Sequence, residues 1–347
     1  MNKEDRLPNR SMITIKDIAR ELGVSVSTVS RALQDNPSIS RERRELIQQF
    51  ARDHHYRPNS MAAALRSSGA RRSNFVGVVL PQFEHYYFSC ILTALEKTLG
   101  KAGYFIVAAQ TGDSYESERA VVEALHHQQV AGIIMSQAKD TRQYDHIQSA
   151  IDDGIPMVFV DRICTGVRTC RVVVDDYAAG FTATEHLILG GCRRIAFMGT
   201  TMNLEISKNR YNGYRDAMHK HGLEIDEHLV LECDNREQAE AITPKLFEMD
   251  NRPDGFFTIN DDTALGVLSS CKRLGLRIPD EVCICGYGDG IRAISCDPQL
   301  TTVVQRGHDV GREAAQVMLD ILNGQIPTGQ FTSRIVKTQL VVRGTTR

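Results

Sequence analysis

The chain has 347 residues, more than twice the usual length of one domain, so we expect two or three domains with large buried cores. Its 42% hydrophobic and 24% charged residues, with 26 Gly and 10 Pro, exclude a collagenous, disordered or disulfide-stapled chain. Apolar stretches such as 75–81 and 104–109 are far shorter than the roughly 20 residues of a membrane span, and the polar first ten residues contain no apolar signal segment. We therefore expect a cytoplasmic protein without a membrane partner.

The nine cysteines are scattered between Cys90 and Cys296 without any C-x-x-C pair. This pattern favours reduced, mostly buried thiols over disulfides or a zinc site. Cys283 and Cys285 alternate with apolar residues, which predicts a packed strand rather than metal ligands. We expect neither a metal nor a cofactor.

The charge is unevenly distributed along the chain. Residues 1–72 contain 14 Lys/Arg against 8 Asp/Glu, a net +6, whereas the remainder contains 27 against 35, a net −8. A basic head on an acidic body suggests a nucleic-acid module joined to a part with another partner. A merely solvated charged face explains the composition equally well.

The head begins with a predicted helix at 15–22 that Thr14 caps, with Asp17 at its third position. Gly23 ends that helix, and Ser25 caps a second helix at 26–33. Two helices joined by a tight glycine turn predict a helix-turn-helix. A third helix follows from Ser40 to about residue 55, and we expect the three-helix core to include Val29, Ala32, Leu33, Ile39, Leu46, Ile47 and Phe50.

The outer face of the second helix presents Val26, Ser27, Ser30 and Arg31. Short residues near a helix N-terminus let it approach base edges in the major groove, and an arginine reaches guanine or a phosphate. The alternative is a three-helix module that binds protein.

Residues 56–69 predict a short alanine-rich helix, capped by Asn59, and then a linker. Two or three turns do not hold a helix alone in water, so this segment needs something that packs on it. Leu65 before Arg66 has the chemistry of an apolar wedge beside a phosphate contact. On spacing alone, Met61 and Leu65 also fit an ordinary apolar stripe.

The stretches TIKDIARELGVSVSTVSRAL and RPNSMAAALRSS together resemble the head and hinge of the LacI/GalR family of bacterial transcription regulators. The resemblance implies that Val26, Ser27 and Arg31 read bases and that Ser25 and Ser30 contact the DNA backbone. It also implies that a homodimer binds a pseudo-palindromic operator and that Leu65 opens the central base step of that operator. The DNA-contacting set that we expect is Thr14, Ser25, Val26, Ser27, Ser30, Arg31, Asn59, Ala62, Leu65 and Arg66.

Beyond residue 74, short β-rich runs alternate with helical segments, and the pattern restarts near residue 172. This alternation predicts two doubly wound parallel sheets, one in each of two lobes. The family resemblance implies that this α/β core is similar to periplasmic binding proteins. We expect a head at 1–57, a hinge and linker at 58–73 and a core at 74–347, with a first lobe of about 74–171 plus 304–325 and a second of about 172–303 plus 326–347.

Ligands of doubly wound sheets bind beyond the carboxyl ends of the strands. The loops there contain carboxylates, amides, arginines and aromatic rings, which suit a sugar or sugar derivative, although each residue alone is common on a solvated surface. By resemblance, Asp161, Arg210 and Asn260 match family effector-contact positions. The effector-binding set that we expect is Phe83, Tyr86, Phe88, Asp161, Arg162, Asp175, Arg210, Asn260 and Asp289.

Two positions depart from the family pattern. Gly288 stands where members often have an aspartate, so that contact is lost or is shifted to Asp289. The loop at 234–236 lacks the stacking aromatic residue of many members, so any stacking must come from residues 83–88.

Two rival functions are weaker. An enzyme on a nucleotide-binding fold lacks its motif, because residues 286–290 read G-x-G-x-G and lie late in the chain. A sugar receptor would require export and would leave the head without a role. The sequence therefore favours a DNA-binding regulator, most simply a repressor without enzymatic activity, that responds to a small effector.

Overall fold

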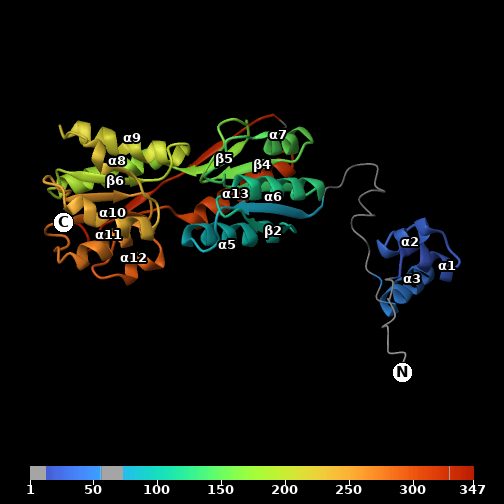
Figure 1. Ribbon diagram of the computed structural model, residues 1–347. Coiled ribbons are helices and arrows are strands. Elements are labelled where there is room, and N and C mark those ends of the chain that lie inside the picture. Colours follow the sequence, from blue (N-terminus) through green and yellow to red (C-terminus); the bar gives the residue numbers. More distant parts are fainter. Residues whose placement is uncertain (1–12, 55, 57–72, 328) are drawn as a thin grey trace, which may run out of the picture. The chain divides into compact units, whose positions relative to one another are not determined.

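The computed structural model describes residues 13–54, 56, 73–327 and 329–347 (Figure 1). Contacts within the chain divide it into two units, Met1–Ser73 and Asn74–Arg347. The predicted hinge helix and linker at 58–73 lie, apart from Ser73, outside the described residues.

The first unit contains the three predicted helices, α1 (Ile15–Glu21), α2 (Val26–Leu33) and α3 (Arg41–Asp53). Gly23 adopts a φ of +61° between α1 and α2, a conformation that glycine adopts without strain. The fully buried side chains of Ile18, Val29 and Ile47, one from each helix, meet in a common core. The chain thus forms a helix-turn-helix closed by a third helix.

The prediction that Leu46 belongs to this core is wrong, because its side chain is 58% exposed. Ile47 and Ala51, four residues apart, form the buried stripe of α3. Adjacent residues on a helix point about 100° apart, so Leu46 cannot share that stripe with Ile47. Gln48, also on α3, makes a polar contact with α2, because its side-chain amide donates to the backbone carbonyl of Ala32 at 2.9 Å.

The first lobe of the second unit is built on a six-stranded sheet of order β11-β5-β4-β3-β1-β2 (Figure 1). The strands all pair in parallel. Successive side chains point to opposite faces, and buried residues from α5 and α13 cover one face while those from α6 and α7 cover the other. The strands are β1 (Phe75–Leu80), β2 (Phe105–Gln110), β3 (Gly132–Met135), β4 (Met157–Val160), β5 (Cys170–Val174) and β11 (Ser333–Val336), and the helices are α5 (Tyr86–Lys101), α6 (Tyr115–His127), α7 (Asp145–Asp152) and α13 (Gly307–Leu322).

The second lobe repeats this plan with a six-stranded sheet of order β12-β10-β9-β8-β6-β7. Only the β10–β12 pairing is antiparallel among the described strands of this sheet. Residues of α8 and α9 cover one face and those of α10 and α11 cover the other. The strands are β6 (Ile195–Gly199), β7 (Val230–Glu232), β8 (Gly255–Thr258), β9 (Cys283–Gly288), β10 (Thr301–Val304) and β12 (Gln339–Val341), and the helices are α8 (Asp176–Leu189), α9 (Glu205–Lys220), α10 (Arg236–Phe247), α11 (Asp261–Arg273) and the short α12 (Ile291–Ser295).

The boundaries between the predicted lobes need two corrections. β5 pairs with β4, so residues 172–174 belong to the first sheet and not to the second lobe. β11 pairs with β5, so residues 333–336 also return to the first sheet, and only β12 joins the second. The repeating sequence pattern marks where an element begins, whereas sheet membership depends on pairing between residues far apart in the chain.

All nine cysteines are free, and Cys283 and Cys285 are buried in β9, which confirms the prediction of packed thiols in a strand. Among the described residues, no helix is both long enough and apolar enough to cross a membrane.

Candidate functional site

The two predicted caps of the helix-turn-helix are present. The Thr14 hydroxyl accepts the backbone N–H of Asp17, whose carboxylate accepts in return from the Thr14 N–H at 3.0 Å. The Ser25 hydroxyl accepts the N–H of Thr28 at 3.1 Å and lies 2.8 Å from the hydroxyl of Ser27. Thr14 and Ser25 therefore fix the beginnings of α1 and α2, and this local role alone explains both residue types.

The other predicted DNA-contacting residues of α2 differ in exposure. Ser27 and Arg31 are exposed, Ser30 is half-buried, and Val26 is half-buried against the core of the head. The guanidinium of Arg31 has no hydrogen bond or ion pair with any residue that the structure describes, so it is available to a partner. Four predicted DNA contacts lie outside the described residues: Asn59, Ala62, Leu65 and Arg66.

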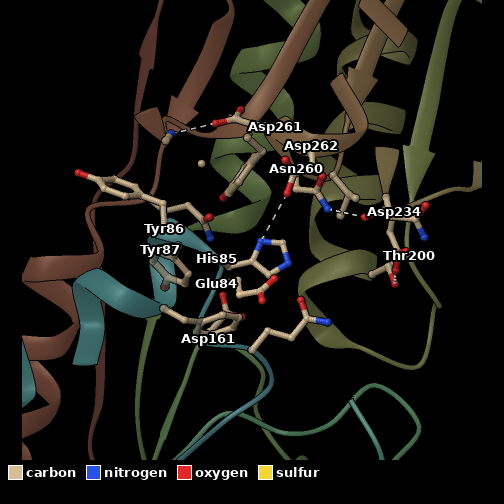
Figure 2. Close-up of a pocket in the computed structure, with 18 of the residues that line it drawn as sticks. Glu84, His85, Tyr86, Tyr87, Asp161, Thr200, Asp234, Asn260, Asp261 and Asp262 are labelled. Carbon is tan, nitrogen blue, oxygen red and sulfur yellow. Dashed lines mark hydrogen bonds and ion pairs between the residues drawn. The ribbon is translucent and has the colours of Figure 1, made fainter. Parts of the chain in front are cut away.

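In the second unit, a cleft of about 860 Å³ lies between the two lobes, at the carboxyl ends of their strands (Figure 2). The first lobe contributes the loop after β1 with the start of α5, one residue after each of β2 and β3, and two residues after β4. The second lobe contributes α9 and the loops after β6, β7, β8 and β9. This is where a doubly wound sheet binds its ligands.

Asp161 follows β4 with a φ of +59° and is 5% exposed. Burial raises the pKa of its carboxyl to about 6, although Arg162 and Arg210 oppose the shift. Its nearest cation is the Nε of Arg162 at 3.9 Å, and it accepts no hydrogen bond from any described residue. The buried Tyr87 hydroxyl and the Nε of Arg162 likewise have no hydrogen-bond partner there. A buried acceptor beside unused donors is typical of a site that a polar ligand completes.

Arg210 from α9 is buried, and its Nε donates to the Asp176 carboxylate at 2.7 Å. Its Nη1 donates to the carbonyl of Ile259 at 2.7 Å, and its guanidinium lies 3.6 Å from the ring centroid of Tyr287. Burial alone would lower the pKa of Arg210, but Asp176, Tyr287 and Asp161 raise it above its ordinary value. The arginine is therefore held as a cation by the fold itself.

An ion pair crosses the cleft. Lys139, after β3 of the first lobe, donates to Asp234, after β7 of the second, at 2.6 Å. Asp234 also accepts from the Thr200 hydroxyl, and its carbonyl accepts from the Asn260 amide at 2.7 Å. Burial opposes ionisation of Asp234, but the hydrogen bonds from Lys139 and Thr200 keep its pKa below the ordinary value. Figure 2 shows a second, weaker crossing, in which His85 lies 3.9 Å from the carboxylate of Asp262.

The structure places six of the nine predicted effector-binding residues on the cleft: Tyr86, Phe88, Asp161, Arg162, Arg210 and Asn260. Three do not line it. Phe83 packs against the core of the first lobe, Asp175 caps α8 through the N–H of Ala178, and Asp289 pairs with Arg343 at 2.6 Å. The expectation that Asp289 replaces the contact missing at Gly288 is therefore wrong, because its carboxylate is engaged elsewhere.

Several cleft residues were missing from the predicted set. Tyr87 and Asp261 are sequence neighbours of Tyr86 and Asn260, and Asp113 and Lys139 follow strands β2 and β3. The rule that ligands bind after strands points to Asp113 and Lys139 in the sequence. Nothing in the sequence marks Tyr287, which lies inside a buried strand.

The G-x-G-x-G run has a packing role. A Cβ on Gly286 would lie 2.5 Å from an Asp261 carboxylate oxygen, and Gly288 has a φ of +141°. The glycines of β9 make room for the buried Asp261, whose pKa burial raises to about 6 against hydrogen bonds from Thr302 and Gly290. Among the described residues no group of three or more His, Cys, Asp or Glu could hold a metal ion.

Comparison with known proteins identifies both units. Residues 14–59 match the family of bacterial regulatory proteins called the lacI family, and residues 184–346 match the periplasmic binding protein-like domain. The chain is 30% identical over 339 residues to a ribose operon repressor of Halalkalibacterium halodurans, covering 97% of this chain and 98% of that protein. It is 27% identical over 336 residues to the HTH-type transcriptional repressor CytR of Escherichia coli (strain K12), covering 96% of each.

Among solved structures, the complex of the transcriptional regulator CelR with cellobiose is similar, with a TM-score of 0.72 and 26% identity, covering 96% of this chain and 99% of that one. The chain belongs to the lacI family of bacterial regulatory proteins. It is a DNA-binding transcriptional regulator with a periplasmic-binding-protein-like core.

Proposed function

We propose that this chain is a homodimeric repressor whose affinity for a two-fold symmetric operator is set by a carbohydrate bound between the two core lobes. It acts in the cytoplasm, where that DNA lies, and it binds its ligand without transforming it. The observation that carries the ligand site is Asp161, a buried carboxyl in the cleft without a hydrogen bond from any described residue.

Carbohydrate is the ligand class that the cleft suits best. Carboxylates accept the protons of sugar hydroxyls, and the rings of Tyr86 and Phe88 offer apolar faces for C–H surfaces. Two of the similar proteins are a ribose operon repressor and a regulator solved with cellobiose, which supports the same class. The ligand would contact both lobes, so its binding favours one relative placement of the lobes over others.

A second copy of the chain would cover an apolar edge of the first lobe. β2 is the edge strand of its sheet, yet Phe105 and Val107 on it are 60% and 41% exposed. Phe75 from β1 lies beside them, with its ring centroid 5.8 Å from that of Phe105. An exposed, apolar edge strand invites pairing or aggregation unless another surface covers it, so we assign this edge to the dimer interface.

DNA contact rests on α2, with Ser27 and Arg31 as its exposed polar residues. The family resemblance adds Asn59, Ala62, Leu65 and Arg66 as proposed contacts. Replacing Arg31 by alanine should weaken binding to the operator by about 1 to 3 kcal/mol if it makes a bidentate base contact. Fluorescence anisotropy with operator DNA and with random DNA of the same length measures the loss.

The matched control is Arg41→Ala on α3, where the arginine is exposed and pairs with Glu45 at 2.8 Å. We expect this change to leave the preference for operator over random DNA unaltered. If Arg31→Ala weakens both DNAs equally, Arg31 contacts phosphate and does not read sequence. If it weakens neither, α2 is not the recognition helix.

A further inference from the structure

The arginines and lysine that line the cleft are each paired with a carboxylate of the protein. At the base, Arg162 pairs with Asp113, and Arg210 pairs with Asp176 at 2.7 Å. Across the cleft, Lys139 pairs with Asp234 at 2.6 Å. None of these three cations is available as a full counter-charge for a ligand.

The same holds at the mouth of the cleft. Arg292 pairs with Asp262 at 2.5 Å, and Arg236 pairs with Glu240 at 2.9 Å. His85 also lies beside Asp262, at 3.9 Å. Among the residues that the structure describes, the cleft therefore contains no arginine or lysine whose charge is free.

Three other carboxyl groups of the cleft are in the opposite situation. Asp161 is buried, and the two cations near it, Arg162 and Arg210, are already paired with other carboxylates. The side-chain carboxylates of Glu84 and Glu237, at the exposed mouth, have no hydrogen bond or ion pair with any described residue, although both residues line the cleft. An anionic ligand would thus meet unpaired negative charge and would find no free cation, in a site where charges are poorly screened.

At the base of the cleft, the groups without a hydrogen-bond partner among the described residues suit a neutral ligand. The Asp161 carboxylate accepts hydrogen bonds, the Nε of Arg162 donates one, and the Tyr87 hydroxyl can do either. Neighbouring hydroxyl groups on a sugar ring both donate and accept, so they match this set. An ammonium group in place of a hydroxyl would also satisfy Asp161.

We infer that the ligand of the cleft is a sugar without an acidic group, either neutral or amino-substituted, and that sugar phosphates and uronic acids are excluded. This rests on the proposed function, in which the cleft binds a carbohydrate. Charge is the property that separates the accepted sugars from the rejected ones, because a sugar and its acidic derivative share the ring and most of its hydroxyl groups.

Calorimetry of the full-length protein against sugars matched in skeleton tests this. The neutral probes are glucose, ribose and cellobiose, the amino probes are glucosamine and its β-1,4 dimer, and the acidic probes are glucuronate, glucose 6-phosphate and ribose 5-phosphate. We expect binding within the neutral or amino group, with the acidic counterpart about a hundredfold weaker, as placing like charges together predicts.

An acidic probe that binds as tightly as its neutral counterpart would overturn the inference and leave the carbohydrate proposal intact. If no probe of any charge binds while operator binding is normal, the carbohydrate part of the proposed function fails, and the inference fails with it.

Inorganic phosphate gives a test that needs no known ligand. The wild-type protein should bind phosphate too weakly to measure, whereas Asp113→Asn, which frees the guanidinium of Arg162, should bind it at least about tenfold more tightly than that detection limit. The matched control is Asp152→Asn on the exposed surface of α7, which should behave like wild type. Phosphate binding by the wild-type protein, or no increase in phosphate affinity in the folded Asp113→Asn variant, would show that the ion pairs of the cleft do not exclude anions.

Discussion

Replacing Arg210 by methionine should lower the free energy of unfolding of the protein by about 3 to 5 kcal/mol, the usual result of removing one partner of a buried ion pair. Among the residues that the structure describes, the carboxylate of Asp176, which is 4% exposed, would keep only the Tyr287 hydroxyl, at 2.8 Å, as a hydrogen-bond partner. The carbonyl of Ile259 would lose its donor as well. Denaturant unfolding followed by circular dichroism measures the change.

Two variants make this result interpretable. Lys208→Met, on the same helix, removes a surface ion pair with Glu205 and should change stability by less than about 1 kcal/mol. Adding Asp176→Asn to Arg210→Met should recover part of the loss, because the uncompensated charge is then gone. If Arg210→Met is as stable as the Lys208 variant, the arginine is not held by the fold and serves the ligand alone.

Replacing Asp161 by asparagine should stabilise the protein at neutral pH. The pKa of this carboxyl is raised from 3.8 to about 6 by burial in the folded state, so folding favours its protonated form. That contribution to stability is complete below pH 3.8 and is lost as the pH rises through 6. The stability lost is about 3 kcal/mol by pH 7.5 and roughly half of that by pH 5. Asparagine stays neutral and tolerates the positive φ of this position.

Unfolding of wild type and Asp161→Asn at pH 5 and pH 7.5 tests this. The advantage of the variant should be larger at pH 7.5, while the exposed control Asp152→Asn should show none at either pH. An advantage that does not change with pH would mean that the Asp161 carboxyl ionises in the fold as easily as in the unfolded chain. Sugar affinity should fall in the same variant, because asparagine lacks the charge that strengthens hydrogen bonds from hydroxyl groups.

Local sequence patterns predicted most of the elements, because each pattern depends on residues close together in the chain. The caps Thr14 and Ser25 and the alternating residues around Cys283 and Cys285 are examples. These local patterns do not show which distant strands pair with one another, so β5 and β11 were assigned to the wrong lobe. The same limit applies to Leu46, whose pattern fits a helix but does not say which face of that helix meets its neighbours.

The ends of the predicted strands indicated where the cleft lies. They did not show which side chains enter it, because adjacent residues have different roles. Asp175 caps α8, whereas the adjacent Asp176 is buried against Arg210. Asp289 looked free in the sequence, and only the fold brings Arg343, from near the end of the chain, to pair with it. The ion pairs that neutralise the cations of the cleft include pairs between residues far apart in sequence, such as Lys139 and Asp234, so the proposed charge selectivity could not be predicted without the structure.

The proposed function requires that operator binding be coupled to a ligand in the cleft of the same chain. The most direct measurement selects DNA from a random pool with the full-length protein and then determines its affinity for the selected sequence with and without the sugar that binds most tightly. We predict an inverted repeat that binds two chains, and an affinity that the sugar changes by the same factor as the DNA changes affinity for the sugar. Selection of no common sequence, or a sugar that binds the cleft and leaves operator affinity unchanged, would show that this chain is not a regulator controlled by a ligand in the cleft.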